Sequence, residues 1–423
     1  MKRSAQYDLI VVGGGAMGLS TAYHAGREKL RTLVIEQFSL FNGRSSSGGA
    51  TRQFRIQYAE EYMARLVLQS VPLWDELQGH TGDTLRTKVG SLWFGDPHVD
   101  ASEGQIKAAM EVLTRLGVPY DALKASDLPR YGFEGLPDDY EGLFQADGGT
   151  LNVPGTLQTL HDQAAASGYV TFMPHTRVLG IVPREQGVSV HVDGETYEAA
   201  RVVVAAGPYT NQMLRFLGIE LDITTWQMVS CYFRKRSPDV DYPSWFAFER
   251  AAQHYDPGLY YGFEEVGWSN PGFIRVCPAF ALHTFRDPAD ATDRPDPMDL
   301  WLTSQWVAQH MPGLDPEPRF VSRCLAALPA AGDKKMFLDV APPSVPGHGN
   351  VVVTSAGWAF KLVPMIGKVC VDLAVRGTTE YDISHFAIPR ADAEPGRLMA
   401  AAAAHPAAPA SAAPRRGHGR LPF

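Results

Sequence analysis

The sequence of 423 residues predicts a mixed fold, in which an α/β unit with a parallel sheet is combined with a mainly antiparallel sheet. Three observations support this prediction. A glycine-rich turn between an expected strand and an expected helix occupies residues 8–18. Two later apolar runs, 201–207 and 351–357, end in glycine, as buried parallel strands often do. Between these runs, residues 227–280 hold aromatic segments with the alternation of antiparallel strands.

The glycine-rich turn is typical of a dinucleotide site. Residues 8–12 are expected to form a short buried parallel strand, and the residues after Gly18 carry apolar positions at helical spacing. Gly13 permits the tight turn, Gly15 lets backbone approach a phosphate, and Gly18 lets the helix pack closely on the strand. The N-terminus of that helix would favour a bound anion. A βαβ unit without a ligand is the alternative interpretation.

A second expected strand, residues 32–35, ends at Glu36. An acidic side chain roughly 20 residues beyond the turn can bind ribose hydroxyls. A carboxylate at this position also argues against a bound 2′-phosphate. Strand, turn, helix and acid together predict a Rossmann-type dinucleotide domain.

Composition and charge exclude several classes of function. The net charge is −8, and no Lys/Arg cluster is long enough to suggest a nucleic-acid partner. No apolar run reaches membrane-spanning length and no signal segment precedes the first strand, so we expect a cytoplasmic protein without a membrane partner. The histidines show no paired ligand spacing, and no metal is expected. The cysteines are far apart, which argues against zinc and disulfides: Cys231, Cys277, Cys324 and Cys370.

Three separated segments are expected to build the nucleotide domain. Helices are expected at 60–77 and 104–116 with a strand at 90–94 between them, and a strand meander at 178–182 and 188–192 leads into the run at 201–207. The run at 351–357 precedes an expected helix at 363–375. A sheet domain inserted twice into a nucleotide domain suits an FAD protein better than a two-domain NAD dehydrogenase.

These boundaries divide the chain into domains. We expect an FAD-binding domain of residues 1–88, 146–222 and 318–390, and a substrate domain of residues 89–145 and 223–317. Residues 391–423 are rich in Ala and Pro, a composition that cannot bury a core, and we expect them to be disordered.

With these elements assigned, the chain resembles the amine oxidases of the sarcosine oxidase family along nearly its whole length to about residue 390. The motifs that carry the resemblance are the turn at 13–18, Thr51-Arg52 followed by Arg55, and residues 90–95, 260–263, 323–324 and 356–361. Residues 90–96, 103–106, 145–150, 207–211 and 356–361 are most similar to the members that convert piperideine-2-carboxylate to picolinate in antibiotic biosynthesis. The resemblance implies a D-amino-acid/sarcosine oxidase-like fold, bound FAD, O2 as acceptor and a monomer.

The resemblance implies that Cys324 carries FAD through a thioether bond. From the residues alone, Cys324 would be a buried, inert thiol. The adjacent Arg323 could lower its pKa and favour attack by the thiolate. Besides the four residues of the dinucleotide turn and its acid, five more residues are expected to bind the cofactor. Together with Cys324, the full set is Gly13, Gly15, Gly18, Glu36, Thr51, Arg52, Gly207, Gly357 and Lys361.

The resemblance also places Arg55 and Lys361 around a substrate carboxylate. A guanidinium can clamp a carboxylate with two hydrogen bonds, and an ammonium adds a point charge. For Arg55 the alternative is a surface cation or a structural ion pair, whereas Lys361 follows a glycine-ended strand beside two aromatic residues, an odd place for a solvated lysine. An indole at Trp358 could stack on a flat ring.

Tyr261 and Glu103 are expected to complete the pocket, with Glu103 assisting proton transfer. By itself, Glu103 would be read as a solvated charge in the first turn of a helix. Two positions depart from the family pattern: Arg275 stands where simple sarcosine oxidases have a lysine credited with promoting oxygen reactivity, and Ala279 stands where the nearest relatives have a polar or acidic residue.

We therefore expect a covalent-FAD oxidase that converts a small anionic cyclic imino acid, piperideine-2-carboxylate, to picolinate in two rounds while O2 is reduced to H2O2. The alternative within the enzyme class is an oxidase of sarcosine, an N-methyl amino acid or pipecolate. The alternative outside it is a dinucleotide-binding redox sensor, which would lack substrate-dependent bleaching of the flavin band.

Overall fold

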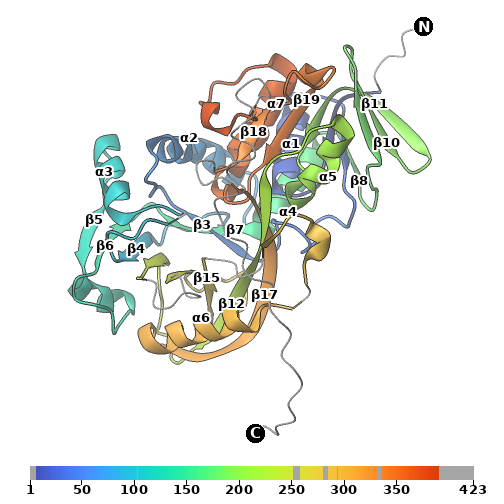
Figure 1. The fold of residues 1–423 in the computed structure, drawn as a ribbon. Coiled ribbons are helices and arrows are strands. Elements are labelled where there is room, and N and C mark those ends of the chain that lie inside the picture. Colours follow the sequence, from blue (N-terminus) through green and yellow to red (C-terminus); the bar gives the residue numbers. More distant parts are fainter. Residues whose placement is uncertain are drawn as a thin grey trace, which may run out of the picture. The chain divides into compact units, whose positions relative to one another are not determined.

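The computed structural model describes residues 6–101, 103–250, 258–279, 284–292, 294–330 and 335–389. The chain divides into two compact units, Met1–Ile388 and Pro389–Phe423. All secondary structure discussed below belongs to the first unit (Figure 1). The predicted disordered tail, residues 391–423, lies outside the described residues.

The first sheet brings together the three predicted segments. Among the described residues it has eight strands, with β18-β19-β11-β1-β2-β8 in order and β10 and β9 extending from β11. The pairs β11·β1, β1·β2, β2·β8 and β11·β19 are parallel. The strands are β1 (Tyr7–Val12), β2 (Thr32–Ile35), β8 (Val170–Met173), β9 (Gly180–Pro183), β10 (Val188–Val192), β11 (Glu195–Val204), β18 (Phe337–Val340) and β19 (Val351–Ser355).

Helices from distant parts of the chain pack on this sheet. α1 (Ala16–Arg27) contacts both α4 (Val153–Ala166) and α7 (Val363–Arg376). The hydroxyl of Ser20 donates to the carbonyl of Val363 at 2.8 Å, which ties α1 to the start of α7. In Figure 1, α1 and α7 lie beside β19 and β11 in the upper half of the view. α2 (Glu61–Gln78) packs on α7, and the short α5 (Thr210–Leu214) follows β11.

The second sheet contains the predicted aromatic strands. Its nine described strands run β16-β12-β15-β14-β13-β4-β6-β5, with β17 also paired to β12, and every pair except β13·β4 is antiparallel. The strands are β4 (Ser91–Gly95), β5 (Asp121–Lys124), β6 (Glu141–Gln145), β12 (Ile223–Lys235), β13 (Ser244–Phe248), β14 (Leu259–Gly262), β15 (Phe273–Pro278), β16 (Thr284–Phe285) and β17 (Leu314–Pro329). The mixed α/β and antiparallel fold predicted from the sequence is therefore confirmed.

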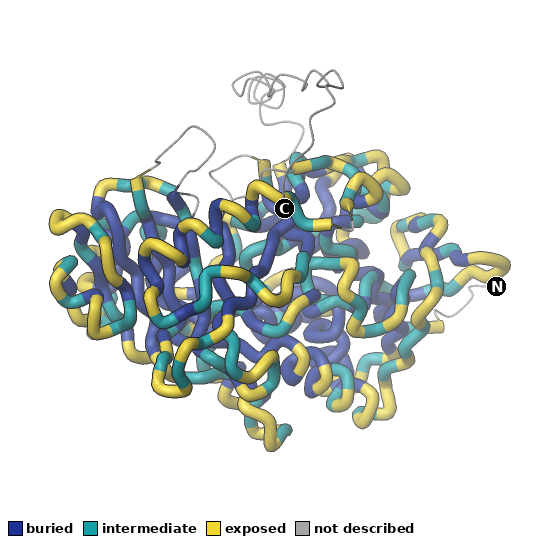
Figure 2. Tube along the Cα trace, turned by 90° about the horizontal axis from the view of Figure 1, so that it is seen from below, coloured by how far each residue is buried: buried dark blue, intermediate teal, exposed yellow. Residues whose placement is uncertain are grey.

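Smaller elements complete the unit. α3 (Ile106–Leu116) packs on β4 and β6, and α6 (Pro297–His310) packs on β12, β15 and β17. The two-stranded sheet of β3 (Thr51–Phe54) and β7 (Gly149–Asn152) lies between the two large sheets in Figure 1. Figure 2 shows buried segments through the interior and exposed positions in the peripheral loops. Among the described residues, no helix has the length and apolar character needed to cross a membrane.

Helices α4, α5 and α6 were not predicted, although α4 and α6 each carry a start signal. The side chain of Asp296 accepts a hydrogen bond from the Met298 amide at 2.7 Å, with Pro297 opening α6. The side chain of Asn152 likewise accepts from the Gly155 amide at 2.9 Å before α4. A capping residue followed by proline is a recognised helix start, so the sequence contained this information.

Candidate active site

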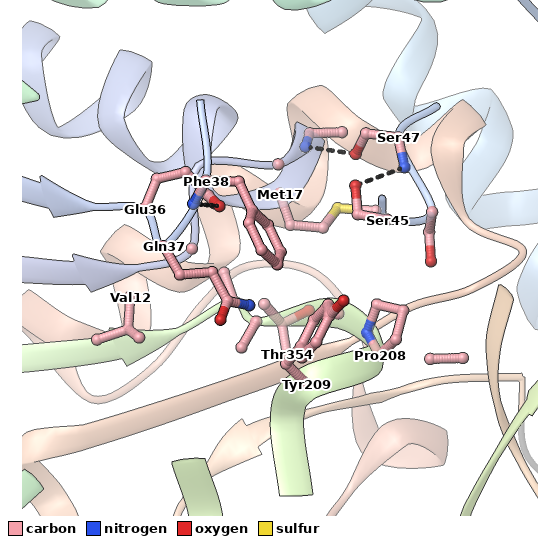
Figure 3. Close-up of a pocket in the computed structure, with 18 of the residues that line it drawn as sticks. Val12, Met17, Glu36, Gln37, Phe38, Ser45, Ser47, Pro208, Tyr209 and Thr354 are labelled. Atoms are coloured by element: carbon pink, nitrogen blue, oxygen red, sulfur yellow. Dashed lines mark hydrogen bonds between the residues drawn. The ribbon is translucent and has the colours of Figure 1, made fainter. Parts of the chain in front are cut away.

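The first cavity lies where the carboxyl ends of β1, β2, β11 and β19 meet. Its volume is about 1010 Å³, including space open to solvent. The turn after β1, the start of α1, Glu36, the segment 45–47 and the segment 205–209 line it. Figure 3 shows Glu36, Phe38, Ser47 and Tyr209 around this space. Ligands of open α/β sheets bind at this edge of the strands.

The three predicted glycines of the turn do different things. Gly13 has φ +111°, and a Cβ there would lie 2.4 Å from the carbonyl oxygen of Ala205. A Cβ on Gly18 would lie 1.8 Å from the carbonyl oxygen of Gly13, so this glycine is required for packing. A Cβ on Gly15 would meet only the hydroxyl of Ser47, at 3.2 Å, and Gly15 lines the cavity whereas Gly18 does not.

Glu36 occupies the predicted position at the end of β2. Its two carboxylate oxygens accept the backbone N–H groups of Gly14 at 2.7 Å and Phe38 at 2.8 Å. A carboxylate has about four lone-pair sites, so it can accept ribose hydroxyls as well. Ser47, which sequence reasoning missed, accepts the N–H of Ala16 at 2.9 Å in the first turn of α1. These residues fit a dinucleotide whose phosphates meet the α1 N-terminus.

A second cavity of about 670 Å³ continues from the first. The two cavities share Ser46, Arg52, Gly357 and Phe360. All six residues predicted from the sequence as catalytic line the second cavity, together with Cys324: Arg55, Glu103, Tyr261, Arg275, Trp358 and Lys361. Four cationic side chains, including Arg52, thus face one carboxylate here. Thr51 and Ala279 do not line it, and Gly207 lines the first cavity.

Arg55 and Glu103 form a buried ion pair across 48 positions of sequence. The second terminal nitrogen of Arg55 donates to the carbonyl of Gln57 at 2.7 Å, and the guanidinium lies 4.5 Å from the ring centre of Tyr58 and 4.7 Å from that of Trp93. Glu103 is only 9% exposed and precedes the start of α3 at Ile106. The interpretation of Glu103 as a solvated first-turn charge is therefore wrong.

Lys361 is buried and lines the same cavity. Its ammonium donates to the hydroxyl of Tyr58 at 2.9 Å and to the carbonyl of Trp358 at 3.2 Å. Burial, and after it the positive charge of Arg55, lowers the pKa of Lys361 to about 7. The backbone carbonyl of Lys361 accepts the indole N–H of Trp74 at 2.7 Å, which fixes the lysine backbone to α2.

Arg275 is tied in place by three hydrogen bonds. One terminal nitrogen donates to the carbonyl and hydroxyl of Thr51 at 2.7 and 2.6 Å, and the other donates to the hydroxyl of Ser230 at 2.7 Å. Its Nε is buried without a hydrogen-bond partner among the described residues. The guanidinium lies 4.8 Å from the ring centre of Phe263. Thr51 therefore holds the Arg275 side chain in the cavity wall, a role that was not predicted from the sequence.

Cys324 and Trp358 come from two different parts of the chain. Cys324 lies in β17 opposite Met228 of β12 and lines the second cavity. Successive side chains of a strand point to opposite faces, and Arg323 does not line this cavity, so the geometry does not support activation of the thiol by its neighbour. The Trp358 ring lies edge-to-face with Trp226 at 5.9 Å between ring centres.

A Cβ on Gly357 would lie 2.3 Å from the carbonyl oxygen of Ala327 in β17. Glycine at this position therefore lets the segment after β19 approach β17 closely, where both cavities meet. The described residues contain no group of three or more His, Cys, Asp or Glu side chains that could hold a metal ion.

Comparisons with known proteins agree with this geometry. Residues 8–373 match the model of the family described as FAD dependent oxidoreductase. The chain is 30% identical to human peroxisomal sarcosine oxidase over 91% of its own length and 96% of that protein. A Dictyostelium discoideum protein named as a bifunctional amine oxidase is 33% identical over 91% of this chain, which spans only 37% of that larger protein.

A solved structure is similar along almost its whole length. It is the open form of NikD, described as an unusual amino acid oxidase essential for nikkomycin biosynthesis. The TM-score is 0.85 with 41% sequence identity, covering 91% of this chain and 98% of NikD.

Proposed function

Because the chain belongs to the FAD-dependent oxidoreductase family that includes the sarcosine oxidases, we propose that it is an FAD-dependent oxidase of a small cyclic imino acid. The substrate we propose is piperideine-2-carboxylate and the product is picolinate. The observation that carries the proposal is the second cavity, where a thiol, five aromatic rings and an excess of cationic side chains adjoin the dinucleotide cavity.

The first cavity would hold the dinucleotide part of FAD. Glu36 would bind ribose hydroxyls, and the α1 N-terminus with Gly15 would receive the phosphates, because unpaired helix amides favour anions. Gly207 and Gly357 line the cavity further along. FAD bound here would supply hydride acceptance from the substrate and reoxidation by O2 to give H2O2.

Covalent attachment of FAD through the Cys324 sulfur is part of the proposal. Cys324 lines the second cavity between Met228 and the segment 357–361, with Tyr261 nearby. Cys231 and Cys370 line neither cavity, and burial raises the pKa of both thiols. Since a thiolate is the reactive form, these two cysteines are poor candidates.

The cationic side chains would bind the carboxylate of the substrate. Arg55 is already paired with Glu103, so the further positive charge comes from Lys361, Arg275 and Arg52. Lys361, with a pKa of about 7, carries its charge mainly below neutral pH. Carboxylate binding should therefore weaken as pH rises through neutrality.

Aromatic side chains would select a flat ring. Trp358 and Tyr261 line the second cavity, and the ring of Phe246 is stacked on Tyr261 with centres 6.0 Å apart. Ala279 is 1% exposed and belongs to the hydrophobic core, so it offers no proton acceptor. Glu103 is then the carboxylate in the cavity that can assist tautomerisation of the ring nitrogen.

The reaction balances over two rounds. Conversion of piperideine-2-carboxylate to picolinate removes four hydrogen atoms as two pairs, and each pair reduces one O2 to one H2O2. The second round is driven by formation of the aromatic ring.

The second candidate is an oxidase of sarcosine, of another N-methyl amino acid or of pipecolate. The identity to human peroxisomal sarcosine oxidase favours it. The indole of Trp358 in the cavity wall disfavours it, because an indole can stack on a flat ring, whereas sarcosine has no ring and the saturated ring of pipecolate is not flat.

The decisive experiment is acid denaturation of the purified holoenzyme, followed by a test for flavin on the polypeptide. We expect flavin to remain attached in the native sequence and in Cys370→Ala, and to be released in Cys324→Ala. Release from the native sequence would refute the covalent assignment. The holoenzyme is then mixed with piperideine-2-carboxylate or sarcosine, and two H2O2 per picolinate are expected with the former. Peroxide from sarcosine alone would favour the second candidate.

A further inference from the structure

We propose that Tyr58 is a positioning residue that holds the Lys361 amine at the substrate cavity in both of its protonation states. The inference rests on the function proposed above, in which Lys361 binds the substrate carboxylate. Tyr58 does not line the substrate cavity. It lies behind it, in the wall of a third cavity of about 290 Å³ that shares Arg55, Glu103 and Trp358 with the second.

Tyr58 contacts both cations of the carboxylate site. Its hydroxyl lies 2.9 Å from Lys361 Nζ, and the residue is only 3% exposed, so this hydrogen bond is shielded from water. The Arg55 guanidinium lies 4.5 Å and Lys361 Nζ lies 5.4 Å from the centre of the Tyr58 ring. The Tyr58 ring therefore contacts both cations, and its hydroxyl forms a hydrogen bond with Lys361.

A phenol can serve an amine in either charge state, because it both donates and accepts. When Lys361 is an ammonium, it donates to the Tyr58 oxygen, as it does here. When Lys361 is neutral, its lone pair can accept the hydrogen of the Tyr58 hydroxyl. Burial raises the pKa of Tyr58 to about 12, so that hydrogen is present at neutral pH. The nitrogen keeps its place when its charge changes.

The charged groups around Lys361 set which form prevails. Arg55 and Lys335 disfavour the ammonium, and Glu103 favours it. Arg275 and Arg52 line the same cavity and add positive charge. Lys335 lies in the wall of the third cavity, away from the substrate side, and forms an ion pair with Glu60 at 2.9 Å.

Two substitutions should therefore move the titration of Lys361 in opposite directions. Hydrogen bonds from a charged donor are stronger than neutral ones, so loss of the Tyr58 hydroxyl weakens the ammonium form more than the neutral form. Tyr58→Phe should lower the pKa of Lys361. Lys335→Gln removes a nearby positive charge and should raise it.

The test measures the affinity of the holoenzyme for pyrrole-2-carboxylate, an inert ring carboxylate, between pH 5.5 and 9. The change in flavin absorbance on titration reports binding. In the native sequence, affinity should fall with a midpoint near the Lys361 pKa of about 7. The midpoint should move down by about one pH unit in Tyr58→Phe and up in Lys335→Gln. Tyr242→Phe, which removes a buried hydroxyl in the core of the second sheet, is the matched control and should not shift it.

The outcomes separate this inference from the proposed function. An unchanged midpoint in Tyr58→Phe overturns the inference while ligand binding by the native protein keeps the proposed function intact. Absence of carboxylate binding by the native holoenzyme at every pH overturns both. If Tyr58→Phe gives no folded holoenzyme, Tyr58→Met removes the same hydroxyl and the same downward shift is required.

Discussion

Alanine at Gly15 and at Gly18 should separate binding of the dinucleotide from packing of the turn. At Gly15 the backbone has φ −78° and ψ −171°, which any residue can adopt, and a new Cβ would meet only the movable hydroxyl of Ser47. Alanine should raise the free energy of unfolding by roughly 0.4–1 kcal/mol, because it lowers the conformational entropy of the unfolded chain. It should lower the free energy of unfolding by a similar amount, because alanine is a poorer helix N-cap than glycine. The free energy of unfolding of the Gly15→Ala apoprotein should therefore stay within about 1 kcal/mol of the native value.

Binding of FAD by Gly15→Ala should nevertheless be weak, because the methyl group enters the space that the phosphates would occupy. Loss of one or two hydrogen bonds to a charged group, at roughly 1.5–3 kcal/mol each, predicts an affinity about 100-fold lower. At Gly18, by contrast, the new Cβ would lie 1.8 Å from the backbone oxygen of Gly13. Such overpacking costs about 3 kcal/mol or more, so Gly18→Ala should destabilise the apoprotein itself.

The assay uses apoprotein in a Cys324→Ala background, so that any FAD bound is held without a covalent bond. Chemical unfolding measures stability, and quenching of FAD fluorescence on titration measures affinity. Native FAD affinity in Gly15→Ala would refute the placement of the phosphates at the α1 N-terminus. Equal destabilisation by the two substitutions would refute the distinction between a glycine needed for the ligand and one needed for packing.

Two further predictions concern buried titratable side chains, Glu103 and His24. Glu103→Gln leaves Arg55 without a counter-charge, so the free energy of unfolding should fall by about 3 kcal/mol. Ring carboxylates should bind more tightly to this variant, because Arg55 is then free to pair with them. Weaker carboxylate binding in a flavin absorbance titration would count against the cationic site. Burial lowers the pKa of His24 to about 4, so the unfolded chain binds more protons between that value and about 6.5, and the free energy of unfolding should fall as pH drops through this window. In His24→Gln this acid-induced loss should be smaller when urea unfolding is compared at pH 7 and pH 5, and an unchanged loss would show that other groups cause it.

Local patterns in the sequence predicted the central strands of the first sheet, β1, β2, β11 and β19, and a dinucleotide site beside them, but not the outer strands β8 and β18. This prediction depends only on backbone geometry within about 30 residues, since it needs a strand, a glycine turn, a helix and an acidic residue at fixed spacing. Gly13, Gly18 and Glu36 lie where that geometry requires. Resemblance to a family then brought Cys324, Trp358 and Lys361 into one expected site, and all three line the second cavity.

The tertiary structure alone decided how the charges of that site are paired. Arg55 meets Glu103, Arg275 meets Thr51, and Lys361 meets Tyr58, which is 303 positions away in the chain. The residue type determines the charge and hydrogen-bonding capacity of a side chain. The packing of distant segments determines how far that side chain is buried and which partner it meets, and burial and partner set the energy of a charge in a protein interior. For this reason Glu103, which its local sequence alone would place in solvent, is the buried partner of an arginine, and Tyr58, which the sequence did not single out, contacts both Arg55 and Lys361.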